Sequence, residues 1–198
     1  MSTDLLGPAR ISGDLSQQVF DTLLRTIAEP GTVRRLPEAL DDRIPKPLWL
    51  PLALTDVDVG VHVDDMDWSR LVRTATSSPV RPLSSAPFVV LPTPTLDQID
   101  GIAIGTALRP EDGARVALPV ERLIDSPDHA TGVGSTHRLE GPGIRDHRLV
   151  TIVGLEPAIV ARLGTGSGPR PTGFDTWLFT PEGDVMAIPR TTHLTETS

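Results

Sequence analysis

Apolar residues near the start of the chain recur every three or four positions. In the stretch 14–31 these residues are Val19, Phe20, Leu23, Leu24 and Ile27. The spacing places them on one face of a helix, and Asp14 followed by Gln17 has the pattern of a capping box. Pro30-Gly31 then stops the helical pattern. The sequence therefore predicts an amphipathic helix over this stretch, with Asp14 as its cap.

The next segment, residues 47–65, is apolar and β-branched and contains two prolines. This composition favours strands over a helix. It predicts a hairpin, with one strand from Leu52 to Asp56, a turn near 58–60 and a second strand through Val63.

Helical and strand patterns alternate along the remaining chain. Thr95 and Gln98 form a capping-box pattern at the start of a predicted helix at 95–106. The other predicted elements are helical turns at 68–79, strands at 86–94, 113–123 and 135–144, a short helix at 156–168 and a hairpin at 174–189. A Gly/Ser/Asp loop at 125–134 separates the two longer strands.

No internal repeat or linker divides the chain, because proline and glycine are scattered evenly along it. The pattern therefore predicts one α/β domain over residues 1–198, with a mixed sheet flanked by helices. We expect a flexible N-terminal segment at 1–13 and a tail at 194–198.

Composition narrows the possible chemistry. The 198 residues suffice for one domain with a real core, which must be built mainly from Leu, Val, Ile and Ala because aromatic residues make up only 4%. Cysteine is absent, which excludes disulfides, thiolate metal sites and a cysteine nucleophile. The sequence therefore indicates no redox role of its own.

Charge and hydropathy limit the partners. The formal net charge is −8, and no basic cluster exceeds Arg34-Arg35, so a surface that follows nucleic-acid phosphates is not expected. No apolar run reaches the length of a signal peptide or of a membrane span. We expect a soluble, cytoplasmic protein that binds neither nucleic acid nor a membrane.

The common catalytic and cofactor motifs do not fit. The glycine-rich stretches at 132–136, 141–144 and 164–168 do not continue to a dinucleotide-binding pattern, and G-x-S-x-G is missing. The single lysine, Lys46, stands between two prolines, which disfavours a pyridoxal-phosphate Schiff base. We expect no cofactor.

The spacing of possible metal ligands gives equally little support for a metal site. His62 with Asp64, Asp65 and Asp67 could in principle hold a cation, but a solvated acidic strand end is the favoured interpretation. We therefore expect no metal.

Three stretches together carry a family resemblance. These stretches are FDTLLRTIAEPG at 20–31, GTALRPEDGARVAL at 105–118 with LEGPGI at 139–144 behind it, and TGFDTWLFTPEGDVMAIPRTTHL at 172–194. In order and spacing the chain resembles PhnH, the H subunit of the carbon-phosphorus lyase system for phosphonate degradation. The last stretch is the most specific, because it combines a strand, a turn and a terminal A-I-P-R-T-T run.

The resemblance implies a subunit that acts with G, I and L partners. Together they attach the ribose triphosphate of ATP to an alkylphosphonate and release adenine. It also implies a fold similar to pyridoxal-phosphate-dependent transferases without that cofactor, a homodimer, and membership of a core complex with G-, I-, J- and L-type subunits. Catalytic residues are not assigned, because the chemistry of the family is thought to lie mainly on other subunits.

Arg190, Thr191 and Thr192 are the first candidate contacts. Pro189 ends the strand before them, and a guanidinium beside two hydroxyls suits a phosphate or phosphonate oxygen. The alternative is a buried ion pair of Arg190 with Glu29 or Asp175, which would fix the terminus or a subunit contact. We favour the ion pair.

Thr106 and Arg109 are the second candidates. They could meet an anion, with Gly105 allowing close approach. However, residues 110–113 have the composition of an ordinary turn, which is the favoured interpretation.

The preferred functional hypothesis is a non-autonomous enzyme subunit of a phosphonate-activating transferase. One alternative is a free-standing binding protein or enzyme for a phosphorylated small molecule, which would use Arg190, Thr191 and Thr192. Another is a pure scaffold subunit.

Overall fold

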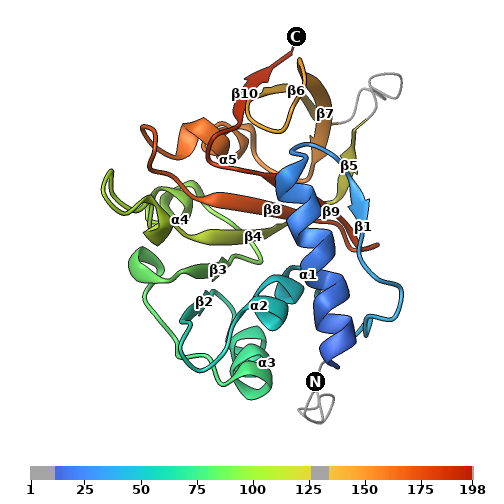
Figure 1. The fold of residues 1–198 in the computed structure, drawn as a ribbon, viewed down its shortest axis with the longest axis vertical. Helices are drawn as coiled ribbons and strands as arrows, with labels where there is room; N and C mark the ends of the chain where they lie inside the picture. Colours follow the sequence, from blue (N-terminus) through green and yellow to red (C-terminus); the bar gives the residue numbers. More distant parts are fainter. Residues whose placement is uncertain (1–11, 126–133, 198) are drawn as a thin grey trace.

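The computed structural model describes residues 12–125 and 134–197. A six-stranded mixed sheet forms its centre, in the order β1-β9-β8-β4-β3-β2 (Figure 1). Its strands are β1 (Arg34–Arg35), β2 (Val61–Val63), β3 (Phe88–Val90), β4 (Arg115–Pro119), β8 (Asp175–Phe179) and β9 (Asp184–Ile188). β2, β3, β4 and β8 are parallel, whereas β9 is antiparallel to both β8 and β1.

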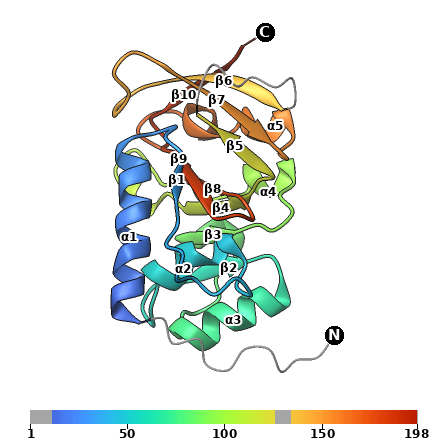
Figure 2. The same cartoon turned by 90° about the vertical axis from the view of Figure 1, so that its right-hand side faces the viewer.

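A second, four-stranded antiparallel sheet lies at one end of the molecule, in the order β10-β6-β7-β5 (Figure 2). Its strands are β5 (Arg122–Ile124), β6 (Ser135–Glu140), β7 (Arg148–Val153) and β10 (His193–Glu196). The α/β prediction with a mixed sheet and helices is confirmed, but the sequence did not indicate a second sheet.

Helices cover both faces of the central sheet. They are α1 (Gly13–Ala28), α2 (Trp49–Leu54), α3 (Met66–Thr76), α4 (Leu96–Asp100) and α5 (Pro157–Val160), with 3-10 turns η1 (Lys46–Leu48), η2 (Leu83–Ser85), η3 (Pro110–Asp112) and η5 (Gly164–Ser167). Figures 1 and 2 show α1, α2 and α3 on one side, with α4 and α5 on the other.

Alternation along the central strands builds two cores. Ala117, Trp177 and Ala187 point to the core under α1, α2 and α3. Their neighbours Leu118 and Leu178 point to a second core, which also takes in residues of the small sheet. This follows from the period of two along a strand, which sends successive side chains to opposite faces. The central strands are therefore apolar on both sides.

The first helix forms as predicted, but its cap and its buried face differ. Ser12, not Asp14, is the N-cap, and its hydroxyl accepts a hydrogen bond from the backbone N–H of Leu15 at 3.2 Å. Val19 and Leu23 are buried, whereas Phe20 and Leu24 are exposed. The helix contacts the protein along a narrower stripe than the periodicity indicated.

The predicted hairpin at 52–63 is wrong. Residues 49–54 form α2, and β2 pairs in parallel with β3 instead of with a preceding strand. Residues 49–52 are all buried, and a continuously buried apolar run has no periodicity that separates helix from strand. Pro47 sits near the start of η1, where its missing N–H costs nothing.

The other predicted elements are largely present. The structure shows α3, β3, the capping box of Thr95 and Gln98 on α4, α5 and the β8–β9 hairpin. The predicted strand at 113–123 is instead two strands, β4 and β5, which belong to different sheets. Most of the predicted loop at 125–134 lies outside the described residues.

The expected terminal segments are the remaining differences. Residues 194–196, expected to form a tail, pair with β6 as part of β10. At the other end, Gly13 already belongs to α1, and residues 1–11 lie outside the described part of the chain. Within residues 12–125 and 134–197, no helix combines the length and apolar character needed to cross a bilayer.

Candidate functional site

Arg190 follows directly after β9 and Pro189, where the central sheet ends. Its Nε lies 3.1 Å from Asp175 Oδ1 and its Nη2 lies 2.7 Å from Asp175 Oδ2. The backbone N–H of Arg190 also donates to Asp175 Oδ1, at 2.9 Å. The side chains are only 13% and 15% exposed. The result is a bidentate, nearly enclosed ion pair between the first residue of β8 and the residue that follows Pro189 after β9.

A third segment completes this contact. Arg190 Nη1 donates to the backbone oxygen of Pro110 in η3. Gly113 lies against the backbone oxygen of Gly173 and against the same guanidinium, leaving no room for a Cβ. Residues 110–113, 173–175 and 189–190 therefore meet at one point, which we call the Arg190 junction.

The guanidinium at this junction is already engaged. The two donors that would bind a phosphate side by side are held by Asp175, and Nη1 is on Pro110. The structure thus pairs Arg190 with Asp175, one of the two carboxylates that the sequence offered. In this arrangement the arginine joins three segments and does not present its fork to an anion.

Thr191 and Thr192 do not form a hydroxyl pair beside that guanidinium fork. Thr192 is completely buried, and its hydroxyl has no hydrogen-bond partner among the described residues. Its backbone N–H donates to Pro189 and its carbonyl accepts from the N–H of Thr165, at 2.9 and 2.8 Å. Thr191 is half-buried. The Thr192 hydroxyl is therefore closed to a ligand arriving from solvent.

Glu29 lies elsewhere, at the end of α1. Its carboxylate pairs with Arg34 at 2.6 Å and is about half exposed. Arg148 of β7 donates to the backbone oxygen of Pro30 beside it, at 3.0 Å, and thereby ties the end of α1 to the small sheet. Glu29 is not part of the Arg190 junction.

Thr106 and Arg109 form a local turn. Their backbone groups bond to each other in both directions at 3.1 Å, and the Thr106 hydroxyl accepts from the Arg109 N–H at 3.0 Å. The Arg109 side chain is 69% exposed and lies 3.1 Å from Asp112. The geometry is that of the turn considered from the sequence, with the arginine directed to its own neighbours.

The possible cation site around His62 is not formed. His62 Nδ1 lies 3.2 Å from the backbone oxygen of Arg81, Asp64 accepts from Gln98 at 2.6 Å, and Asp65 caps α3. In the described ranges no three His, Asp or Glu side chains converge as metal ligands. The single lysine, Lys46, is 11% exposed and pairs with Asp42 at 2.7 Å.

The pKa values of several ionisable groups away from the junction are shifted, among them those of His137 and Asp41. Burial lowers the pKa of His137 in β6, a shift that nearby Glu196 partly opposes. Hydrogen bonds from Arg43 lower the pKa of the Asp41 carboxyl to about 2. The first shift couples the small sheet to pH, whereas the second reflects an exposed local ion pair.

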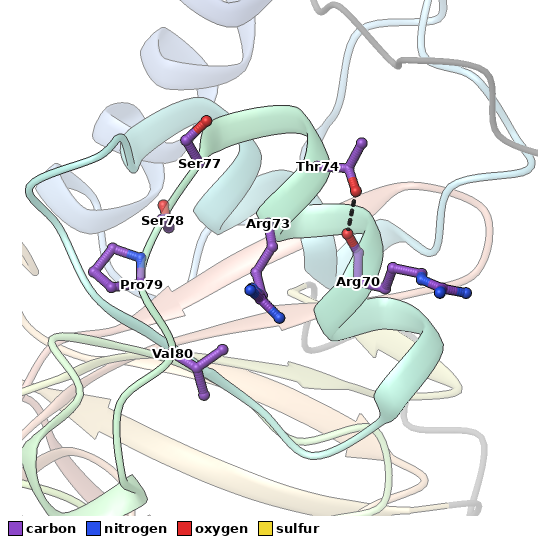
Figure 3. Close-up of a pocket in the computed structure, with 7 residues that line it drawn as sticks. All are labelled: Arg70, Arg73, Thr74, Ser77, Ser78, Pro79 and Val80. Atoms are coloured by element: carbon purple, nitrogen blue, oxygen red, sulfur yellow. Dashed lines mark hydrogen bonds between the residues drawn. The ribbon is translucent and has the colours of Figure 1, made fainter.

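A surface hollow of about 650 Å³ lies beside the end of α3, and its lining includes none of the candidate site residues named from the sequence (Figure 3). We call it the α3 hollow; it is lined by Arg70, Arg73, Thr74, Ser77, Ser78, Pro79 and Val80. The available sequence signal was two arginines one helical turn apart, followed by hydroxyl residues and a proline. That signal is common on solvated helices, which is why sequence reasoning passed over it.

Comparison with known proteins identifies the family. The family model described as "Bacterial phosphonate metabolism protein (PhnH)" matches residues 12–195, which is nearly the whole chain. The chain belongs to the PhnH family. The family resemblance stated from the three stretches is therefore confirmed.

One curated relative of this PhnH-family chain is similar over part of its length. It is named "Putative C-P lyase subunit protein HtxG", from Stutzerimonas stutzeri, and is 31% identical over 91 residues. The match covers 46% of this chain and 42% of HtxG. The chain thus aligns with less than half of that relative.

Segments of two of the three stretches that carried the PhnH resemblance meet at the Arg190 junction. The Pro110 turn comes from the second stretch, and the Asp175 strand and Arg190 both come from the third. LEGPGI is also close by, because Gly141 lies against the backbone of Thr191 and Thr192. The most specific part of the resemblance therefore coincides with an internal structural contact.

Proposed function

We propose that this PhnH-family chain is a non-autonomous subunit of a carbon-phosphorus lyase complex. With partner subunits it contributes to the transfer of the ribose triphosphate of ATP onto an alkylphosphonate, with release of adenine. Support comes from the family match and from the name of HtxG as a C-P lyase subunit.

The observation that carries the non-autonomous role is the engagement of the Arg190 guanidinium with Asp175 and Pro110. Lys46 is likewise held by Asp42, and the Thr192 hydroxyl is enclosed. These side chains serve the fold. Because these side chains are engaged in internal contacts, they are not available for catalysis by this chain alone. Such a chain is suited to shaping an active site that it shares with partner subunits.

The proposal extends to the assembly. It includes a homodimer, contacts with G-, I-, J- and L-type subunits, a cytoplasmic location and a likeness to the pyridoxal-phosphate-dependent transferase fold without the cofactor. These parts follow from the family resemblance.

The test is reconstitution with purified subunits, ATP and methylphosphonate, with adenine release measured by chromatography. Adenine should appear with the complete set and should fall to background when this chain is left out. Adenine release by this chain alone, at the rate of the complete set, would contradict the proposal. Partial activity of the set that lacks the chain would favour the scaffold role.

A further inference from the structure

The α3 hollow has a polar floor and an open side. Ser78 is buried, and its hydroxyl lies 3.0 Å from the backbone oxygen of Asp56, so it belongs to the floor. Thr74 donates its hydroxyl to the backbone oxygen of Arg70 at 2.8 Å, as Figure 3 shows. Above these residues the side chains of Arg70 and Arg73 are exposed. The guanidinium groups are thus the chemical feature that the hollow presents to solvent.

Neither guanidinium group is paired with a carboxylate of the described residues. Within residues 12–125 and 134–197, neither makes an ion pair or a hydrogen bond, whereas Arg190 is engaged as described above. No carboxylate from the described part of the chain lines the hollow, although the chain has 26 acidic against 18 basic residues. The hollow is therefore a local basic site on an acidic protein, and its charge complements an acidic ligand.

The shape of the hollow favours an extended ligand over a small anion. In Figure 3, Arg73 extends toward Val80, whereas Arg70 extends away from it. Two guanidinium groups that diverge in this way do not hold one phosphate in common, but they can meet successive acidic side chains. Val80 is 53% exposed and adds an apolar surface next to Pro79. Arginine beside apolar residues is typical of protein–protein interfaces.

The other end of α3 sets the direction of such a ligand. A neighbouring hollow shares Arg70 and Arg73, but it also contains Asp64, Asp65 and Asp67 at the start of the helix. These carboxylates repel acidic groups. An acidic segment is therefore directed toward Arg73 and Val80, at the end of α3.

We propose that the α3 hollow binds an acidic segment of a partner polypeptide, with carboxylates on Arg70 and Arg73 and an apolar side chain on Val80 and Pro79. This inference rests on the proposed function, in which the partner is another subunit of the same complex. It assigns the contact surface on this chain.

The test reverses the two charges. Arg70→Glu/Arg73→Glu is compared with Arg122→Glu/Arg145→Glu, which makes the same change in net charge at two other exposed arginines. Affinity for the purified partner subunits is measured at low and high salt. We expect the α3 variant to bind at least about tenfold more weakly and to lose most of the salt dependence. We expect the control to stay close to wild type. Circular dichroism checks the fold, and Arg70→Gln/Arg73→Gln gives a milder second variant.

Several outcomes would overturn the inference. One is equal binding of partner subunits by the wild type and the α3 variants, which leaves the proposed function intact. Another is intact assembly with loss of self-association, which would assign the hollow to a second copy. A third is intact assembly with loss of ATP binding, which would make it a small-anion site. If the wild-type chain binds no partner subunit, that result contradicts the proposed function as well.

Discussion

The Asp175–Arg190 pair is the residue contact on which most of the junction depends. Both side chains are largely removed from water, so each charge is tolerated only because the other is present. Removing one member leaves a buried charge without a partner, and removing Arg190 also frees the Pro110 turn.

We predict that Arg190→Ala and Asp175→Ala each lower the free energy of unfolding by about 3 kcal/mol or more. The double variant should lose less than the sum of the two, because the second change removes an already unpaired charge. Urea unfolding measures all three. Arg162→Ala is the control, since its pair with Asp100 is 44% and 49% exposed and is expected to contribute about 1 kcal/mol or less. Equal losses at Arg190 and Arg162 would contradict the prediction.

His137 links the small sheet to pH. Burial lowers its pKa below the ordinary value of 6.5, so the unfolded chain takes up a proton at a higher pH than the folded chain does. Above the unfolded pKa both forms are neutral and the residue has no effect. As the pH falls through that value, protonation favours the unfolded state and stability decreases.

We therefore predict that the free energy of unfolding falls between about pH 7 and pH 5, and that His137→Gln reduces this fall. Urea unfolding at both pH values gives the slope for each protein. The lowered pKa of Asp41 acts only at more acidic pH, so it does not contribute in this range. The same slope in both proteins would show that His137 is not responsible.

At the residue scale the sequence singled out Arg190 and favoured an ion pair there, but it could not choose the partner. Asp175 and Glu29 were both plausible, and the choice depends on the register of β8 against β9, which brings residues 15 positions apart together. Arg70 and Arg73 were not singled out, because the sequence does not show whether a guanidinium group pairs with a carboxylate; this is visible only once distant segments are placed in space.

At the scale of elements, α1 shows that apolar periodicity predicts a helix but does not predict which of its apolar residues are buried. Its apolar spacing predicted a helix correctly, but Phe20 and Leu24 are 43% and 50% exposed. Periodicity gives the direction of the apolar face, whereas the width of the covering surface decides which residues are buried. Here α1 packs on β9 and α2, which cover only part of the face.

We predict that Leu23→Ala lowers the free energy of unfolding by about 2–5 kcal/mol, because Leu23 is 1% exposed and its removal leaves a cavity. Leu24→Ala, one position further along the same helix, should cost about 1 kcal/mol or less. Chemical denaturation of the two variants provides the comparison. A similar loss for both would mean that Leu24 is covered in solution.

The small sheet contains strands that the sequence pattern did not predict. β7 and β10 were not predicted, and β10 pairs with β6, more than fifty positions earlier in the chain. β10 is a short strand, HLTE at 193–196, in which a single apolar residue stands among polar ones, so it has little pattern of its own. Its pairing comes from tertiary contacts that a local sequence pattern does not contain.

At the scale of the whole molecule, the two cores share the central sheet. β4, β8 and β9 send alternate residues to each core, and the second core joins this sheet to Leu139 and Ile152 of the small sheet. All three tryptophans belong to the first core or pack against it. A disturbance in the small sheet should therefore reach the tryptophans through shared strands.

We predict one cooperative unfolding transition, reported identically by tryptophan fluorescence and by far-ultraviolet circular dichroism. Leu139→Ala, at a fully buried site in the small sheet, should shift both signals to lower denaturant by the same amount. A fluorescence transition that stays in place while the dichroism gains an earlier phase would show that the small sheet unfolds separately.

The strand order also determines how much of the central sheet can form while the chain is still being synthesised. β8 lies between β4 and β9, and among the described strands β1 pairs with β9 alone. β1 and the free edge of β4, which already pairs with β3, therefore gain their partners only after residues 175–188 have been synthesised. Until then a nascent chain carries an open sheet edge, and the part of α1 that packs on β9 is uncovered. A premature stop codon before β8 would thus produce a chain without a completed sheet, instead of a smaller stable domain.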